Sequence, residues 1–324
     1  MFPNSTQSRT WMFSSEDEVT ALRESTNAEH ICRYGRNVPD AKKYEYFLTP
    51  EEECIMVRKF EFHLRDFCRN FQPPMPKYVV GTAFHYFKRF YIYNSVMNYH
   101  PKEIMVTCIY LASKVEEFHV SISQFVANIK GDRGKASDII LNNELLLMEQ
   151  LKFNLTIHNP FRPVEGLLID IKTRSTLNDP ERLRPGIDDL FDSIYLTDGI
   201  LLYSPSQIAL AAVLHAASKL QENLDSYVTD TLFGEEGQDN LMTLIEAVKG
   251  IRSMVKVTDV LPDKNQLKLL DKKLERCRNP ENNPDSEIYK KRMLAMLDDE
   301  DEAYNQIMSA KMEADNSALN IQVI

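Results

Sequence analysis

Few residues in the sequence have the types and the spacing that enzymatic chemistry requires. Its seven histidines are scattered, and none lies at metal-ligand spacing from another histidine or a cysteine. Glu116 and Glu117 could be taken for an acid–base pair, but adjacent residues on a helix point in different directions. There is no glycine-rich phosphate loop and no GxSxG motif. The sequence therefore predicts no catalytic group, no metal site and no cofactor.

Glu116 and Glu117 directly follow a long apolar run. Residues 104–115 read IMVTCIYLASKV and are almost wholly apolar, which predicts a helix buried on most of its circumference. Lys114 suits the negative end of the helix dipole, whereas Glu116 and Glu117 do not. Two interpretations remain open at this point: an ordinary solvated helix end, or an acidic rim that faces something outside the chain.

Helical periodicity accounts for the elements around this run. Glycine is scarce, at 10 of 324 residues, and no alternating β-branched runs occur, so we expect an all-α fold. Ser15 begins a helix at 16–33, and a loop with two prolines follows at 34–50. The next five helices are expected at 51–70, 77–93, 101–115, 121–130 and 137–151.

A second set of five helices repeats the first. They are expected at 161–173, 180–202, 206–220, 223–233 and 238–257. The string YHPKEI at 99–104 aligns with YSPSQI at 203–208, an offset of 104 residues. This length is too great for a solenoid repeat, so the chain contains a duplicated five-helix domain whose third helix is central. We expect five regions: 1–50, 51–157, 158–257, the helices of 258–298, and an acidic, disordered tail at 299–324.

Composition limits the classes of partner. With 38 basic and 48 acidic residues the formal net charge is −10, which is unfavourable for binding a nucleic-acid backbone directly. No apolar run has the length of a membrane span. The five cysteines show no two-residue spacing, which indicates reduced thiols in the cytosol or nucleus. A binding scaffold for another protein is therefore favoured.

Three strings in the first repeat resemble the cyclin box, and the transcription-linked cyclins in particular. They are YFKRFY at 86–91, LASKVEEF at 111–118 and ELLLMEQLKFNL at 144–155. Strings outside them are similar to the cyclin H family: QSRTWMFSS at 7–15, HNPFRPVEGLLIDIKTR at 158–174 and YSPSQIAL at 203–210. The resemblance implies two tandem five-helix cyclin boxes with extra helices at both ends.

The resemblance also implies a function and partners. Such a cyclin is a non-catalytic regulatory subunit that binds and activates cyclin-dependent kinase 7 in the CDK-activating kinase. It supports phosphorylation of kinase activation loops and of the RNA polymerase II C-terminal tail. The other implied partners are the RING-type assembly factor ménage à trois and the core of TFIIH, which implies a nuclear location.

The resemblance implies six residues that contact the kinase. The family's docking lysine falls on Lys114 and its glutamate on Glu144, 30 residues later. The apolar contacts fall on Val115, Phe153 and Leu155, and Glu117 lies on the same rim. Ser218 stands opposite Lys114 by the repeat offset, so we expect the kinase on the first box.

Two departures from cell-cycle cyclins follow from the same alignment. The substrate-docking patch of those cyclins is replaced by MVRKF at 56–60, with His63 at the position of its tryptophan, so no RxL-type docking is expected. Their buried arginine–aspartate pair falls on Val57 and Lys88. That pair is therefore absent, and the first two helices of the box must be held together differently.

Two other functions are open alternatives. One is a cyclin C-like subunit of the Mediator kinase module, and the other is a TFIIB-like DNA-binding core, which the net charge disfavours. Ser5 lies in a polar N-terminal segment and is a candidate phosphorylation site, although it could equally be a merely solvated serine.

Overall fold

The computed structural model describes residues 2–36, 38–175, 177, 179–234, 238–257 and 263–295, and within these ranges every regular element is helical. The expected all-α fold is therefore confirmed. The chain divides into two compact units, residues up to Cys277 and residues from Arg278. The predicted disordered tail at 299–324 lies outside the described residues.

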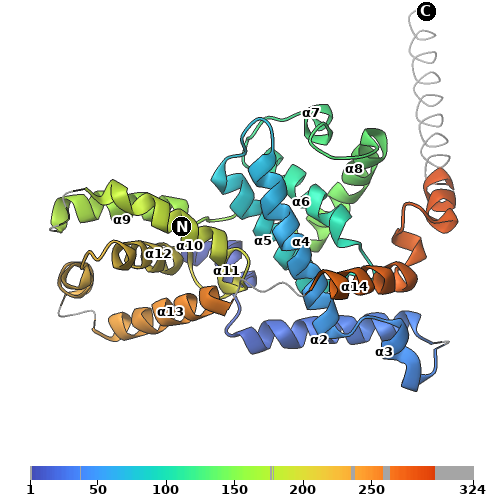
Figure 1. Cartoon of the computed structure of the whole chain (residues 1–324), viewed down its shortest axis with the longest axis horizontal. Coiled ribbons are helices and arrows are strands. Elements are labelled where there is room, and N and C mark those ends of the chain that lie inside the picture. Colours follow the sequence, from blue (N-terminus) through green and yellow to red (C-terminus); the bar gives the residue numbers. More distant parts are fainter. Residues whose placement is uncertain are drawn as a thin grey trace, which may run out of the picture. The chain divides into compact units, whose positions relative to one another are not determined.

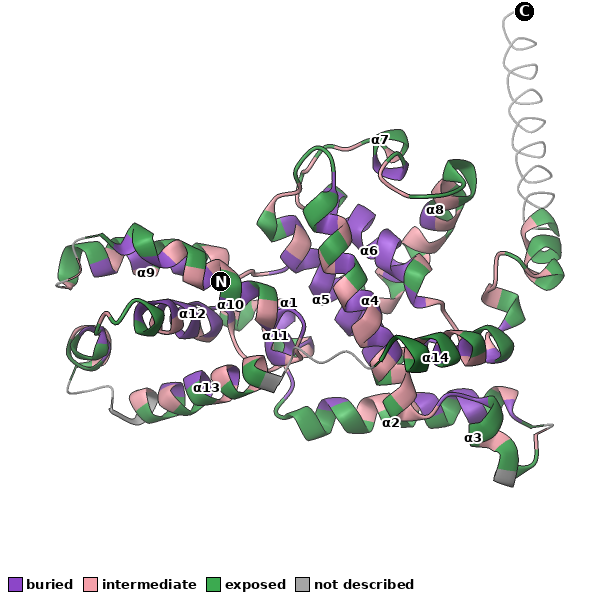
Figure 2. Cartoon of the chain, viewed as in Figure 1, coloured by how far each residue is buried: buried purple, intermediate pink, exposed green. Residues whose placement is uncertain are grey.

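The first bundle comprises α4 (Pro50–Asn70), α5 (Lys77–Tyr93), α6 (Pro101–Val115), α7 (Ile122–Val126) and α8 (Arg133–Gln150) (Figure 1). Pro50 and Pro101 each occupy the first turn of a helix, where a missing N–H costs nothing. Helix α6 has eleven of its fifteen residues buried and packs against α4, α5 and α8. Its central place is the one that its apolar sequence predicts (Figure 2).

The second bundle comprises α9 (Phe161–Arg174), α10 (Arg184–Ile194), α11 (Gly199–Leu202), α12 (Pro205–Lys219) and α13 (Gln238–Val257). Helix α12 is its centre, with nine of fifteen residues buried and contacts to α9, α10 and α13. Pro205 begins α12 as Pro101 begins α6, so the two halves of the sequence repeat occupy equivalent places.

Several predicted helices are wrong in extent, although their positions are right. The helix expected at 180–202 is divided into a 3-10 turn (Pro180–Leu183), α10 and α11. The one expected at 121–130 is the short α7, and the one expected at 223–233 is a π-helical segment (Tyr227–Phe233). The loop expected at 34–50 contains a 3-10 turn (Asp40–Lys42) and α3 (Lys43–Tyr46). Elements of one or two turns depend on tertiary contacts, so periodicity over a longer window does not define their ends.

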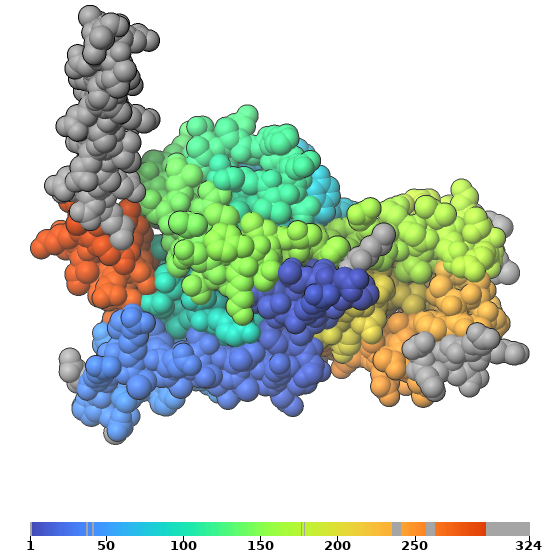
Figure 3. Space-filling model, turned by 180° about the vertical axis from the view of Figure 1, so that it is seen from behind, coloured from blue at the N-terminus to red at the C-terminus, as the bar shows by residue number. Residues whose placement is uncertain are grey.

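The N-terminal segment connects the two bundles. It contains a 3-10 turn (Phe2–Asn4), α1 (Thr6–Thr10) and α2 (Glu16–Tyr34). Gln7 accepts a 2.7 Å hydrogen bond from the backbone N–H of His158, in the chain between the bundles. The N–H of Phe13 donates to the carbonyl of Leu201 in α11. In Figure 3 this segment, in dark blue, lies against the light-green chain that follows α8. Trp11 is fully buried, so the segment belongs to the core.

Helix α14 (Lys264–Cys277) packs on the outside of α3 and α4. Lys59 pairs with Asp271 at 2.6 Å, and Lys273 pairs with Glu52 at 2.6 Å. Lys59 belongs to the MVRKF string, which replaces the substrate-docking patch of cell-cycle cyclins. Helix α14 therefore covers part of the surface that corresponds to that patch. The second unit is described on its own by a 3-10 turn (Pro280–Asn282) and a helical stretch at 287–295.

Candidate functional site

Lys114 and Glu144, which the sequence places 30 residues apart, are neighbours in the structure. The Nζ atom of Lys114, near the end of α6, lies 2.5 Å from Oε1 of Glu144 in α8. The Lys114 side chain is 50% exposed and the Glu144 side chain 14% exposed. The pair is therefore a surface feature whose unused N–H groups and carboxylate oxygen can reach a partner.

The end of α6 is shaped by a left-handed residue. Glu117 has φ of +56°, and the next N–H, that of Phe118, returns to the carbonyl of Ser113 at 2.8 Å. This closure satisfies carbonyl groups that the helix end would otherwise leave free. Gln221 ends α12 in the same way, with φ of +58°, and it is the repeat equivalent of Glu117. The backbone at Glu117 is thus a property of the repeated fold, and only its exposed side chain is a candidate for function.

The predicted apolar contacts lie close to the ion pair along the chain: Val115 follows Lys114, and Phe153 and Leu155 come shortly after the end of α8. Phe153 follows α8 in the left-handed region, with φ of +55°, and its side chain is 61% exposed. Val115 and Leu155 are partly buried and pack against the core. Phe153 is the one phenylalanine with an exposed side chain among the described residues, and its N–H donates to the carbonyl of Met148, one turn after Glu144 in α8. Such a surface can receive the exposed face of another protein's helix.

Glu116 differs from its neighbour Glu117. Its carboxylate accepts a 2.5 Å hydrogen bond from Oγ1 of Thr82 in α5, and its side chain is half-buried. Burial raises the pKa of the Glu116 carboxyl, and the bond from Thr82 opposes that rise. Of the two glutamates of LASKVEEF, Glu116 therefore joins α5 to α6, while the side chain of Glu117 is exposed.

Ser5 has a structural role of its own. It caps α1: its hydroxyl accepts from the N–H of Ser8 at 3.2 Å and donates to the carbonyl of Phe2 at 2.6 Å. A phosphate on Ser5 would replace that donor, although negative charge at a helix start is favourable. Phosphorylation of Ser5 stays a prediction.

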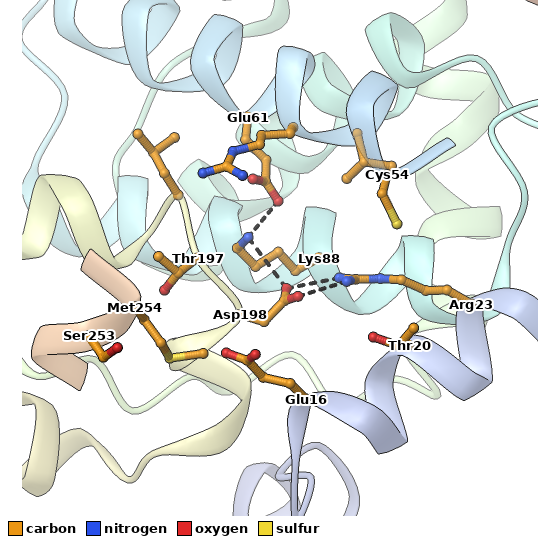
Figure 4. A pocket seen from close by; sticks show the side chains of 13 residues that line it. Glu16, Thr20, Arg23, Cys54, Glu61, Lys88, Thr197, Asp198, Ser253 and Met254 are labelled. Atoms are coloured by element: carbon orange, nitrogen blue, oxygen red, sulfur yellow. Dashed lines mark hydrogen bonds and ion pairs between the residues drawn. The ribbon is translucent and has the colours of Figure 1, made fainter. Parts of the chain in front are cut away.

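A second lysine–glutamate pair holds the first bundle together internally. Lys88 in α5 lies 2.5 Å from Glu61 in α4, with side chains only 2% and 4% exposed. Asp198, at the start of α11, lies 3.7 Å from Lys88 and accepts two hydrogen bonds from Arg23 of α2, at 2.7 and 2.9 Å. Figure 4 shows these four residues linked one to the next by hydrogen bonds and ion pairs, and all four line a cavity of about 360 Å³.

This charge cluster explains how the bundle manages without the arginine–aspartate pair of cell-cycle cyclins. Lys88 occupies one position of that pair, but its partner is Glu61, one turn after Val57. Burial raises the pKa of Glu61, and Lys88 opposes the rise. Burial alone would raise the pKa of Asp198 too, but Arg23 and Lys88 hold it well below its usual range. The cluster joins the N-terminal helix, the first bundle and the second bundle.

Sequence reasoning missed Glu61, Asp198 and Arg23. For Glu61 a signal exists: it lies in the apolar stripe of α4 formed by Val57, Leu64 and Cys68, where a charged residue must find a buried partner. Asp198 and Arg23 are 175 residues apart, and no local pattern links them.

The described residues contain no group of three or more His, Cys, Asp or Glu that could hold a metal ion. The buried His85 has no hydrogen-bond partner for Nδ1 among these residues. Burial holds its pKa well below the usual value and keeps the ring neutral. Among the described residues, no helix combines the length and the apolar composition that a membrane span requires.

Comparisons with known proteins bear on both bundles. The family model described as the cyclin N-terminal domain matches residues 62–156, and that of the cyclin C-terminal domain matches residues 159–256. Cyclin-H of Xenopus laevis is 42% identical over 286 residues, which are 87% of this chain and 88% of that protein.

Two solved structures share the fold over most of the chain. A chain of the CAK complex from Chaetomium thermophilum matches with a TM-score of 0.76 and 26% identity, covering 91% of this chain and 93% of its own. A chain of the yeast TFIIK (Kin28/Ccl1/Tfb3) complex matches with a TM-score of 0.62 and 28% identity, covering 78% of this chain and 99% of its own. The two helical bundles are cyclin domains, and the chain belongs to the cyclin family, within it to the cyclin H group.

Proposed function

We propose that this cyclin binds and activates cyclin-dependent kinase 7, as the regulatory subunit of a CDK-activating kinase that also serves TFIIH. The observation that carries the proposal is the surface pair Lys114–Glu144, with Phe153 exposed just after the end of α8. The similarity to Cyclin-H and to chains of the CAK and TFIIK complexes supports this choice of kinase over a cyclin C-like role or a TFIIB-like one.

The docking site would act by positioning the kinase's regulatory helix. Phosphoryl transfer by a protein kinase requires the glutamate of that helix to pair with the lysine of the ATP site. Lys114 supplies N–H donors for backbone carbonyls of the kinase, and Glu144 supplies an acceptor for its backbone N–H groups. Val115, Phe153 and Leu155 bury apolar surface of the same helix, and Glu117 borders it. The kinase conformation that fits this surface is thereby favoured over the inactive one.

The cyclin would contribute no catalytic group. Its docking residues are a lysine, two glutamates and three apolar side chains that bind rather than react, and the phosphates and magnesium belong to the kinase. The substrates of the complex would be kinase activation loops and the RNA polymerase II C-terminal tail. We also propose the RING-type assembly factor ménage à trois and the TFIIH core as partners, and the nucleus as the location. The structural similarity of this chain to chains of the CAK and TFIIK complexes supports these assignments.

The test is a kinase assay on complexes reconstituted from the purified chain and cyclin-dependent kinase 7. We expect phosphorylation of an RNA polymerase II tail peptide to rise at least tenfold over the kinase alone, and the chain alone to show no activity. Adding the assembly factor should raise it further. No activation with a folded chain would reject the proposal, and activation of the Mediator kinase instead would favour a cyclin C-like role.

A further inference from the structure

A small cavity lies on the second bundle at the end of α12, where the repeat places Ser218 opposite Lys114. Its volume is about 230 Å³, and its walls come from α10, α12 and α13, which pack on one another (Figure 1). The residues that line it are Leu190, His215, Ser218, Arg252, Val255 and Lys256. The two bundles thus differ at equivalent places, since the first carries the ion pair Lys114–Glu144 and the second carries this cavity.

The walls of this cavity are positively charged, and no acidic side chain balances them. Arg252 and Lys256 lie one turn apart on α13, and neither has an ion-pair partner among the residues that the structure describes. Within the same part of the chain, no aspartate or glutamate lines the cavity. Asp189, in α10, is already paired with Lys219 at 3.2 Å. Two cations therefore remain for an acceptor from outside the chain, although the net charge of the chain is −10.

Several hydrogen-bond donors line the cavity, and one of them is buried. The Nε atom of Arg252 is excluded from water and has no hydrogen-bond partner in the described part of the chain. A buried donor without an acceptor is unfavourable, so a ligand that accepts from it is favoured. Ser218 and Lys256 are exposed and add a hydroxyl and an ammonium group. Burial, together with Lys219 and Arg252, lowers the pKa of His215, so its neutral ring offers one further N–H.

A phosphate monoester matches these donors better than other anions do. It carries a charge near −2 at neutral pH and three acceptor oxygens, whereas a carboxylate has a single charge and two oxygens. The planar guanidinium of an arginine also fits the geometry of a phosphate. Pockets that hold whole small ligands begin at about 300 Å³, so this cavity suits one phosphorylated side chain rather than a nucleotide.

We propose that this cavity binds a phosphorylated serine or threonine in a peptide segment of a partner protein, with Arg252, Lys256 and Ser218 as donors to the phosphate. Recognition of phosphorylated segments by clustered cations is a recurrent mode of peptide binding. Phosphorylation of the partner would then control its attachment to the second bundle. The docking residues for the kinase lie on the first bundle, so the proposal goes beyond kinase activation and does not depend on it.

The test follows the N–H resonance of the Arg252 Nε by NMR, in the full chain labelled with nitrogen-15. The resonance is identified by its absence from Arg252→Lys. Titration with the peptide Gly-Ala-Ser-Ala-Gly phosphorylated on its serine should give a saturable shift that weakens as salt is added. The unphosphorylated peptide should give no shift, and a peptide with glutamate in place of phosphoserine should bind at least tenfold more weakly.

Three outcomes of this titration would overturn the proposal. The first is the absence of a saturable shift with the phosphorylated peptide. The second is equal binding of the glutamate peptide, which would make the cavity a general site for acidic side chains. The third is a shift with inorganic phosphate but not with the phosphorylated peptide, which would make it a site for a free anion.

Variants of α13 locate the site, with affinity measured by the fluorescence anisotropy of the phosphorylated peptide carrying fluorescein. Arg252→Gln should weaken binding at least tenfold and Lys256→Gln about threefold. Lys249→Gln is the matched control, since it removes an exposed lysine of the same helix that does not line the cavity, and its affinity should stay within about 1.5-fold.

Full affinity in a folded Arg252→Gln chain would overturn the proposal, and where that variant does not fold, full affinity of Lys256→Gln would do so. Equal losses in Lys249→Gln and Lys256→Gln would also overturn it, because the peptide would then be attracted by the general charge of the helix.

Discussion

The first cyclin domain contains two lysine–glutamate pairs with the same contact distance and opposite environments. Lys114–Glu144 and Lys88–Glu61 both close to 2.5 Å. Lys114 is 50% exposed and Glu144 is 14% exposed, whereas Lys88 and Glu61 are only 2% and 4% exposed. An exposed pair adds little to stability and can exchange its partner for another protein's groups. A buried pair cannot exchange, and losing one member leaves an uncompensated charge. Burial, rather than distance, thus distinguishes the pair that we propose as a docking contact from the pair that holds the bundle together.

The largest expected effect is on the buried pair. Lys88→Met should lower the free energy of unfolding by about 3–5 kcal/mol, because Glu61 is left buried without its cation. Urea denaturation followed by circular dichroism measures it. The double variant Glu61→Leu/Lys88→Met should recover most of the loss, since no charge is then stranded. A loss below about 1 kcal/mol in the single variant would mean that water reaches Glu61 and that the cluster does not hold the bundle.

Substitutions in the pair Lys114–Glu144 should weaken kinase binding and leave the fold intact. Lys114→Glu and Glu144→Lys each place like charges together and remove a group offered to the kinase. We expect each to weaken binding of cyclin-dependent kinase 7 about ten- to a hundredfold. Calorimetric titration of the kinase measures this loss, and circular dichroism should show unchanged helix content.

A matched control exists in the second domain. Lys219, the last residue of α12, is also 50% exposed and pairs with Asp189 at 3.2 Å. Lys219→Glu should leave kinase binding within about twofold of the native chain. If it weakens binding as strongly as Lys114→Glu does, the kinase does not dock on the first domain alone.

The interior can also be tested through a buried histidine that stays neutral in the folded chain. His30 in α2 is buried, its Nε2 has no hydrogen-bond partner among the described residues, and Arg33 is its charged neighbour. Burial, assisted by Arg33, lowers the pKa of His30 to about 4. The unfolded chain therefore binds a proton near pH 6.5 that the folded chain refuses, and stability falls as pH drops from about 6.5 toward 4.

Because of His30, the free energy of unfolding should be about 1 kcal/mol lower at pH 5.5 than at pH 7.5. The measurement is the free energy of unfolding at both values, in the native chain and in His30→Phe, whose ring can pack against Tyr34 and Phe47 as the imidazole does. His30→Phe should lose correspondingly less between the two pH values. The same pH slope in both proteins would assign the loss to other groups, such as His85.

How far the sequence predicts this molecule depends on the range of the interaction concerned. The central helices α6 and α12 follow from local apolarity and from Pro101 and Pro205, and the pair Lys114–Glu144 follows from the resemblance to cyclins. Asp198 could not be predicted, because a residue in a helix expected to be continuous instead begins α11 and binds Arg23. Trp11 belongs to the QSRTWMFSS string that resembles the cyclin H family, but no local pattern predicts that Arg89 and Lys152 both lie over its ring. Contacts between distant segments are thus what local patterns leave undetermined.

The smallest expected effect on the free energy of unfolding is that of Lys114→Met, the exposed counterpart of Lys88→Met. Lys114→Met removes the same charge that Lys88→Met removes, from a side chain that also lies over the ring of Tyr110 at 5.6 Å. The free energy of unfolding should change by less than about 1 kcal/mol, because Glu144 can be hydrated in place of its lost partner. Urea denaturation of the two methionine variants in parallel measures the difference directly. A loss as large as that of Lys88→Met would make Lys114–Glu144 a structural pair, and weakened kinase binding by Lys114→Glu would then reflect a damaged fold rather than a docking contact.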